Sequence, residues 1–150
     1  MLYYKIFPAC RPDLYLTLNP TDDQNSAVLK APLAGRDEDR QLWTPLETFS
    51  GVGNKEFVLL NKYNNKVLAA RGERQTVTQI SLSEIPKHFA TWSYLPVAKW
   101  NVFGGIQLNA DRAMNLNAFG DTWGEDTKVG IHDWKNGAPN EVWQFALVQA

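Results

Sequence analysis

Three tryptophans recur at nearly equal intervals along this chain of 150 residues. Trp43, Trp92 and Trp143 are separated by 49 and 51 residues. Two further sets of positions keep a similar spacing, at Val28, Val77 and Val129 and at Thr17, Leu68 and Asn115. A long period with several markers in register indicates a fold built from equivalent units. We therefore predict one domain, residues 1–150, made of three repeats that cover approximately residues 1–50, 51–98 and 99–150.

Short runs of alternating apolar and polar residues fill each repeat, and clusters of glycine, proline, asparagine and aspartate separate them. The clearest runs lie in the third repeat, at 114–117, 128–134 and 142–145. A period of two residues is typical of short antiparallel strands with one buried face. We expect an all-β chain of about twelve strands, four in each repeat, with no long helix. The three repeated tryptophans are expected in the core, where equivalent large rings pack together.

The composition limits the partners and the compartment of the chain. The formal net charge is -1, so the sequence indicates neither nucleic acid nor an acidic membrane surface as a partner. No apolar run approaches the length of a membrane span, and the N-terminus lacks the pattern of a secretory signal. The single cysteine, Cys10, excludes an internal disulfide. We therefore expect a protein that is cytoplasmic or released without a signal peptide.

No catalytic or cofactor-binding motif stands out in the chain. His88, His132 and Cys10 lack the spacing of a zinc site, and no glycine-rich phosphate-binding loop is present. The acidic residues are scattered singly, apart from Asp37, Glu38 and Asp39. The sequence therefore favours a binding protein without a cofactor or metal over an enzyme.

The residues from Asn140 to Phe145, Asn-Glu-Val-Trp-Gln-Phe, resemble the Asn-Gln-x-Trp-x-Phe ending of ricin-type (R-type) β-trefoil lectin repeats. Met114 to Leu116 resembles their Leu-Asp-Val segment, and Val129 to His132 their Ile-Gln-Leu-Trp segment. The resemblance implies a β-trefoil, in which three repeats of four strands form a six-stranded barrel and its cap of hairpins. It also implies a lectin that binds glycans of the galactose or N-acetylgalactosamine type.

A sugar site needs a flat apolar surface and a few planar polar groups that bond adjacent hydroxyls. The family supplies an aspartate from the first strand, an aromatic ring from the valine strand and an asparagine before the tryptophan. The register places these positions at Asn115, His132 and Asn140 in repeat three, at Leu68, Ile80 and Phe89 in repeat two, and at Thr17, Ala31 and Arg40 in repeat one. Repeat three alone combines a polar group, a planar ring and an amide, so we place the site there.

The predicted site departs from the family pattern at two positions. Asn115 replaces the aspartate, which removes a charged acceptor, and His132 replaces the usual tryptophan or tyrosine. Gly130 is expected to leave room beside the histidine ring. Trp123 lies in a polar turn, where we expect an exposed ring that contacts the ligand. The predicted carbohydrate-binding residues are Asn115, Trp123, Gly130, His132, Asn140 and Glu141.

Structural roles remain an alternative for these residues. Asn115 and Asn117 also fit polar residues of a strand or turn, and His132 fits an ordinary surface residue. The whole chain has an alternative function as a protein-binding trefoil, such as a protease inhibitor, that inserts the loop from Gly35 to Arg40 or the loop from Ala118 to Thr127 into its partner. Agglutination by a lectin with a single site would require a homodimer.

Overall fold

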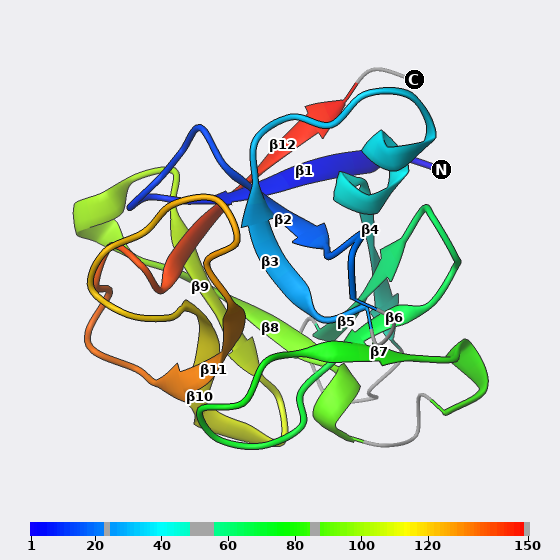
Figure 1. The fold of residues 1–150 in the computed structure, drawn as a ribbon. Helices are drawn as coiled ribbons and strands as arrows, with labels where there is room; N and C mark the ends of the chain where they lie inside the picture. The colour runs from blue at the N-terminus through cyan, green and yellow to red at the C-terminus, as the bar shows by residue number, and fades with distance from the viewer. Residues whose placement is uncertain (23–24, 49–55, 85–87, 149–150) are drawn as a thin grey trace.

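The computed structural model describes residues 1–22, 25–48, 56–84 and 88–148 (Figure 1). The predicted boundary between repeats one and two lies at 49–55, outside the described residues. The described residues form twelve strands, β1 (Tyr3–Pro8), β2 (Tyr15–Leu18), β3 (Ala27–Lys30), β4 (Trp43–Thr48), β5 (Glu56–Asn61), β6 (Val67–Ala69), β7 (Thr78–Ile80), β8 (Trp92–Pro96), β9 (Gly104–Leu108), β10 (Asp111–Ala118), β11 (Val129–Asp133) and β12 (Val142–Val148). The prediction of an all-β chain with four strands in each repeat is confirmed.

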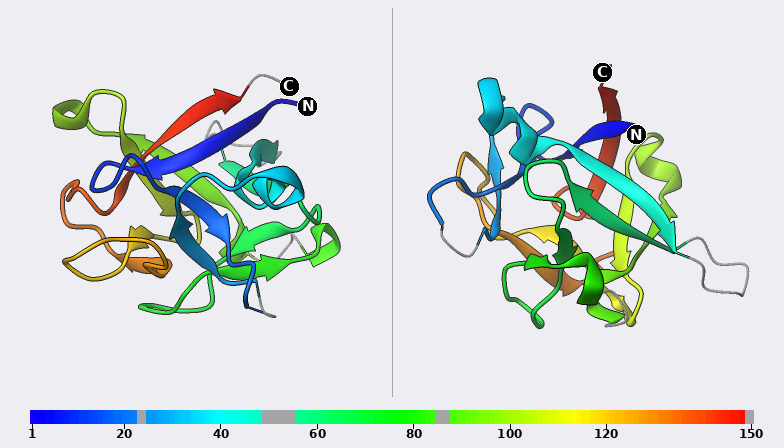
Figure 2. Two further views of the ribbon diagram at one scale, coloured as in Figure 1. Left: turned by 45° about the horizontal axis from the view of Figure 1, so that its top comes forward. Right: turned by 90° about the vertical axis from the view of Figure 1, so that its right-hand side faces the viewer.

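Six of these strands close into a barrel. β1 pairs with β4, β4 with β5, β5 with β8, β8 with β9, β9 with β12, and β12 returns to β1, all antiparallel. The other six strands form three hairpins, β2 with β3, β6 with β7 and β10 with β11. The views in Figure 2 show the barrel strands and the hairpins from two further sides. A closed six-stranded barrel with three hairpins is the predicted β-trefoil.

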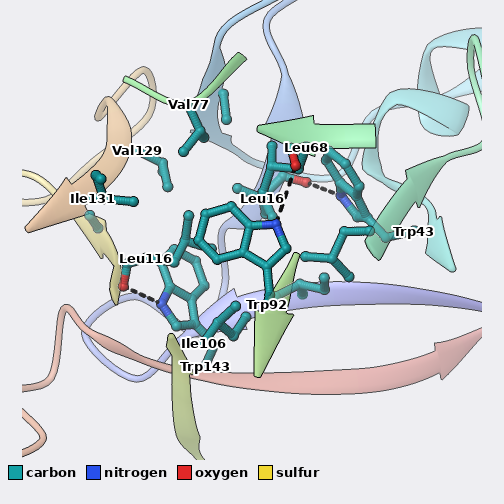
Figure 3. Close-up of a cluster of buried hydrophobic side chains, with 14 of the residues drawn as sticks. Leu16, Trp43, Leu68, Val77, Trp92, Ile106, Leu116, Val129, Ile131 and Trp143 are labelled. Atoms are coloured by element: carbon teal, nitrogen blue, oxygen red, sulfur yellow. Dashed lines mark hydrogen bonds between the residues drawn. The ribbon is translucent and has the colours of Figure 1, made fainter. Parts of the chain in front are cut away.

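The core repeats the same tryptophan contact three times (Figure 3). Trp43, Trp92 and Trp143 are each 0% exposed. Their indole N–H groups donate to the backbone carbonyls of Leu16, Leu68 and Leu116, at 3.0, 3.2 and 2.9 Å. The last barrel strand of each repeat, β4, β8 or β12, is thereby tied to the hairpin of its own repeat, and each of the three indole N–H groups has a partner. The prediction that these tryptophans form the core is confirmed.

This contact also fixes the register of the repeats and corrects two sets of markers. The residues that follow the three acceptor leucines are equivalent, so Thr17 corresponds to Ala69 and Asn117 rather than to Leu68 and Asn115. On the partner strand, Leu18 pairs with Ala27 and Ala118 with Val129, which makes Ala27, and not Val28, the equivalent of Val129. The repeat exists as predicted, but Leu68, Asn115 and Val28 are each displaced by one or two residues from the equivalent positions.

The structure adds four short 3-10 helices, η1 (Gly35–Gln41), η2 (Leu82–Glu84), η3 (His88–Ala90) and η4 (Ala98–Trp100). The first of them occupies the segment expected to be a loop. Its last turn is buried, because the guanidinium of Arg40 stacks 3.9 Å from the ring centroid of Tyr63. Within the described ranges, the structure has no helix long and apolar enough to cross a membrane.

We predict that Cys10 resists alkylation in the folded protein. It packs against the core, and burial raises the pKa of its thiol to about 11. Because the thiolate is the nucleophile, its reaction with iodoacetamide at pH 8 should be at least about tenfold slower than in urea. The unfolded chain ionises first, so this group stabilises the fold fully below about pH 9 and loses that contribution as the pH rises toward 11. Initial rates from pH 7 to 10 measure this, with Cys10→Ser as the unlabelled control. A folded-state rate that follows an ordinary thiol would contradict it.

Candidate functional site

A small polar pocket opens beside the β10–β11 hairpin. Its volume is about 290 Å³. We call it the repeat-three pocket, and its lining residues are Asn117, Phe119, Gly120, His132, Lys135 and Asn140. Strand β10 supplies Asn117, strand β11 supplies His132, and the loop before β12 supplies Asn140. The pocket therefore gathers side chains from three segments of one repeat.

Two side-chain amides are fixed against each other in this pocket. The Asn140 amide nitrogen donates to Asn117 Oδ1 and to the carbonyl of Ala118, both at 2.9 Å. The Ala118 N–H donates in return to the Asn140 carbonyl, also at 2.9 Å. These bonds use the Asn140 amino group and leave its Oδ1 as an acceptor. The Asn117 amino group has no hydrogen-bond partner among the described residues, so the pair offers one donor and one acceptor side by side.

Two rings and a cation complete the pocket. His132 is half-buried, and its Nδ1 accepts the Asp133 backbone N–H at 2.7 Å, which leaves Nε2–H as the donor of the neutral ring. Phe119, also half-buried, adds an apolar face. Lys135 lies 4.0 Å from the Asp133 carboxylate, so its ammonium is partly compensated. The arrangement suits a small neutral ligand with an apolar face and several hydroxyl groups.

Glu141 holds the loop that shapes the pocket and faces the protein interior. Its side chain is 0% exposed. The carboxylate accepts the backbone N–H groups of Lys135, Gly137 and Ala138 at 2.8–2.9 Å. The prediction that Glu141 contacts the ligand is therefore wrong, because every oxygen is already engaged with the loop. Its role is to position Lys135 and the chain before Asn140.

Gln41 performs the same task in repeat one. Like Glu141, it lies two residues before a core tryptophan and is 0% exposed. Its Oε1 accepts the Leu33 N–H at 2.9 Å, and its Nε2 donates to the carbonyl of Ala31 at 3.0 Å and to the hydroxyl of Thr17 at 3.1 Å. Gln41 bonds both donors and acceptors, whereas Glu141 meets only N–H groups. The amide of Gln41 therefore suits a loop that presents both donors and acceptors, and the carboxylate of Glu141 suits a loop that presents only N–H donors.

Asn115 is also removed from the site by its burial. It is 0% exposed, and its amide nitrogen donates to the carbonyls of Leu116 and Glu141, at 2.9 and 3.4 Å. Its Oδ1 has no partner in the described part of the chain. Asn117, two residues further along β10, lines the pocket instead. The pocket therefore includes Asn117 from this hairpin and leaves out the buried Asn115.

Gly130 and Trp123 also have structural roles. A side chain at Gly130 would overlap the backbone of Gln75 and the ring of Phe119, so this glycine admits the crossing chain of repeat two. Trp123 was expected to be exposed, but it is half-buried against the core and donates its indole N–H to the Ala118 carbonyl at 3.2 Å. Arg11 secures the same turn by donating to the Trp123 carbonyl at 2.7 Å. Neither residue lines the repeat-three pocket.

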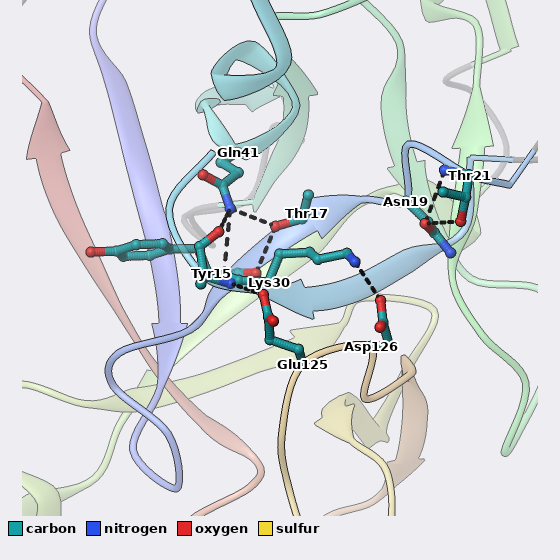
Figure 4. Close-up of polar contacts among 9 residues, drawn as sticks. Tyr15, Thr17, Asn19, Thr21, Lys30, Gln41, Glu125 and Asp126 are labelled. Atoms are coloured by element: carbon teal, nitrogen blue, oxygen red, sulfur yellow. Dashed lines mark hydrogen bonds and ion pairs between the residues drawn. The ribbon is translucent and has the colours of Figure 1, made fainter. Parts of the chain in front are cut away.

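The equivalent positions of the other repeats lack this polar pair. Repeat one has Thr17, Lys30 and Arg40 in place of Asn117, His132 and Asn140. Thr17 is bonded to Gln41, and Lys30 forms an ion pair with Asp126 at 2.6 Å (Figure 4). Repeat two has Ala69, Ile80 and Phe89, which carry no polar side-chain group. The contacts of repeat one and the apolar residues of repeat two leave repeat three as the polar candidate.

A sequence signal for Asn117 existed in the spacing to the tryptophans. The acceptor leucine lies 27 residues before the tryptophan in both repeat one and repeat three. The residue after this leucine is Thr17 in repeat one and Asn117 in repeat three, so these two positions are equivalent. In repeat two the acceptor leucine, Leu68, lies only 24 residues before its tryptophan. A single spacing for all three repeats therefore misplaces the equivalent residues. Phe119 and Lys135 had no comparable signal, because loop geometry brings them to the pocket.

No protein-family model and no curated protein sequence matches this chain. Among solved structures, it is similar to ThreeFoil, a designed protein with threefold symmetry, with a TM-score of 0.79, 16% identity, and coverage of 96% of this chain and 97% of that one. The C-terminal half of an earthworm R-type lectin in complex with N-acetylgalactosamine gives a TM-score of 0.74 and 13% identity, covering 99% of this chain and all of that one.

Other similar structures belong to toxins. A mosquitocidal holotoxin matches with a TM-score of 0.81 and 14% identity over 96% of this chain, which corresponds to 16% of the holotoxin chain. The same fold therefore occurs both as a separate domain and as part of a longer protein. At these identities the likeness establishes architecture, and together with the closed barrel and three hairpins it shows that the chain is a β-trefoil protein.

Proposed function

We propose that this chain is a non-enzymatic lectin that binds neutral glycans in the repeat-three pocket. The observation that carries the proposal is the bonded pair of Asn117 and Asn140 beside the rings of His132 and Phe119. Vicinal hydroxyls of a sugar need a donor and an acceptor at fixed positions, and the C–H face of the sugar needs a flat apolar surface. The pocket provides both within one repeat.

Galactose or N-acetylgalactosamine is the proposed sugar type. The earthworm lectin structure, which has the same fold, holds N-acetylgalactosamine. The amides of Asn117 and Asn140 are neutral, so the bonds they form are weaker than those of the aspartate in the family pattern. We therefore expect affinity for a single sugar in the micromolar to millimolar range.

Substitutions in repeat three should reduce glycan binding, and matched substitutions in the other repeats should not. Asn140→Ala and His132→Ala each remove one contact, which should lower affinity by about tenfold or less. The controls are Phe89→Ala and Arg40→Ala, which lie three residues before their core tryptophans, as Asn140 does. Calorimetry with N-acetylgalactosamine measures affinity, and a melting curve shows whether each variant is folded. Unchanged binding in both repeat-three variants would overturn the site.

A second comparison separates the two asparagines of β10. Asn117→Ala removes the free amino group from the pocket and should weaken binding to a similar extent. Asn115→Ala removes a buried side chain that does not reach the pocket, so it should change stability and leave affinity unchanged. Loss of binding in Asn115→Ala, with affinity retained in Asn117→Ala, would restore the register expected from sequence.

A further inference from the structure

A second, more apolar pocket lies at the opposite end of the barrel interior from the hairpins. The core tryptophans bond to the hairpins, and alternate residues of a strand share a face. Two residues beyond each tryptophan, Pro45, Tyr94 and Phe145 therefore form the next layer, away from the hairpins. All three line a pocket of about 610 Å³, about twice the volume of the repeat-three pocket. We call it the barrel-mouth pocket and define it by Tyr4, Phe57, Tyr94, Asn101, Gln144 and Phe145.

Its aromatic wall consists of rings that pack against one another. The Phe145 ring meets Tyr4, Phe57 and Tyr94 in edge-to-face contacts, with centroids 6.1, 6.3 and 6.1 Å away. Tyr94 also lies over Gly104, where any side chain would overlap its ring. Even so, Tyr94 is 40% exposed. A ring that is fixed by its neighbours and open to solvent can stack on a ligand with little loss of side-chain entropy.

The polar groups of the barrel-mouth pocket are neutral and free. The side-chain amides of Asn101 and Gln144 make no hydrogen bond with any described residue. The Tyr94 hydroxyl also has no protein partner in the described ranges, and partial burial raises its pKa, so it remains a neutral donor. None of the described residues that line this pocket is charged. A charged ligand would therefore lose its hydration without an ionic partner.

Asn101 is held in an unusual backbone conformation. Its φ of 59° and ψ of −90° lie outside the regions that asparagine normally adopts. The turn is held because the Asn101 N–H donates to the Ala98 carbonyl at 3.3 Å and the Trp100 indole donates to the Gly137 carbonyl. Residues kept in strained conformations cluster at ligand-binding sites, where the surrounding structure fixes them. This conformation places the Asn101 amide at the edge of the barrel-mouth pocket.

We propose that the barrel-mouth pocket is a second carbohydrate site, which takes a neutral oligosaccharide of at least two sugar rings. One ring stacks on Tyr94, and its hydroxyls bond the amides of Asn101 and Gln144. A purely apolar ligand would bury these amides without partners, which is unfavourable. A neighbouring depression of about 390 Å³ shares Pro45, Phe57 and Tyr94, and provides space for the second ring, with the exposed Glu47 carboxylate on its lining as an acceptor for hydroxyl groups. The inference extends the proposed glycan binding but uses no residue of the repeat-three pocket.

Side-chain amide signals in NMR spectra of the full ¹⁵N-labelled chain test this site directly. The probes are N-acetylgalactosamine, a neutral galactose-terminated tetrasaccharide, and phenol as an uncharged aromatic compound without sugar. The tetrasaccharide is expected to shift the amide signals of Asn101 and Gln144 in a saturable manner. Tyr94→Ala should weaken this response by about tenfold or more, and Tyr94→Phe by less, because the ring remains. Leu82→Ala, at an exposed apolar residue outside the pocket, is the matched control.

The two sites are distinguishable because their reporting amides differ. Shifts at Asn117 and Asn140 with none at Asn101 and Gln144 would overturn this inference and leave the proposed function standing. Shifts at Asn101 and Gln144 alone would support the barrel-mouth site and overturn the repeat-three site. Shifts caused by phenol and not by the tetrasaccharide would overturn the saccharide assignment. A retained response in folded Tyr94→Ala would also overturn it.

Discussion

Replacing Glu141 by alanine is expected to lower the free energy of unfolding by about 2–4 kcal/mol, because it leaves several partly or fully buried N–H groups without their acceptor. The carboxylate accepts the N–H groups of Lys135, Gly137 and Ala138, all within 2.9 Å. For a chain of this size, the melting temperature should fall by roughly 5–15 °C. The variant should also bind glycan less tightly, because the loop positions Lys135 and Asn140 in the repeat-three pocket.

Glu141→Gln is the informative control for this prediction. It keeps the shape of the side chain but turns an NH₂ group toward N–H donors, so it should be less stable than wild type and more stable than Glu141→Ala. The reverse change in repeat one, Gln41→Glu, should also destabilise, because its carboxylate would face the carbonyl of Ala31. Chemical denaturation of the three variants measures these differences. A Glu141→Ala protein as stable as wild type would show that water replaces the carboxylate without loss.

Gly130→Ala is expected to cost about 1–3 kcal/mol, because the new methyl group overlaps atoms that cannot move independently. One of these is the backbone oxygen of Gln75, where repeat two crosses β11, and the other is the ring of Phe119. Relief of the overlap displaces the Phe119 ring, which forms the apolar face of the repeat-three pocket. Both thermal stability and affinity for N-acetylgalactosamine should therefore fall.

The matched control is Gly124→Ala, on the loop between β10 and β11. The nearest atom to a methyl group there is the Arg11 guanidinium, at 4.0 Å, which is an ordinary contact. This variant should melt within a few degrees of wild type and bind glycan equally well. Equal melting temperatures for Gly124→Ala and Gly130→Ala would contradict the role assigned to Gly130.

The spacing of the tryptophans predicted most of the fold. Trp43, Trp92 and Trp143 occupy equivalent core positions because a large ring repeated once in every unit can be buried only around a shared axis. The alternation of apolar and polar residues predicted the strands, since the strand period places one face inward. The choice of the third repeat for the site rested on its polar residues, and the bond between Asn117 and Asn140 was not visible in the sequence.

The candidate site depends on contacts that the alternation of apolar and polar residues does not predict. Asn115 and Asn117 are two residues apart on one strand, so the period of the sequence cannot distinguish them. The indole of Trp143 distinguishes them, because its bond to Leu116 sets the register. Likewise, the sequence gives no indication that Glu141 faces N–H groups, since the loop from Lys135 to Ala138 has to fold around it first.

The sequence by itself therefore determined the number of repeats, the strand-rich architecture and the core tryptophans, because these follow from local periodicity and from the burial of large rings. The tertiary structure alone decided which residues line a pocket and which are covered by other segments. The backbone of Gln75 occupies the space beside Gly130. Trp123 lies in a turn that Arg11, from the other end of the chain, holds by a hydrogen bond. These contacts join segments that are distant in sequence, and their geometry exists only once the barrel has closed.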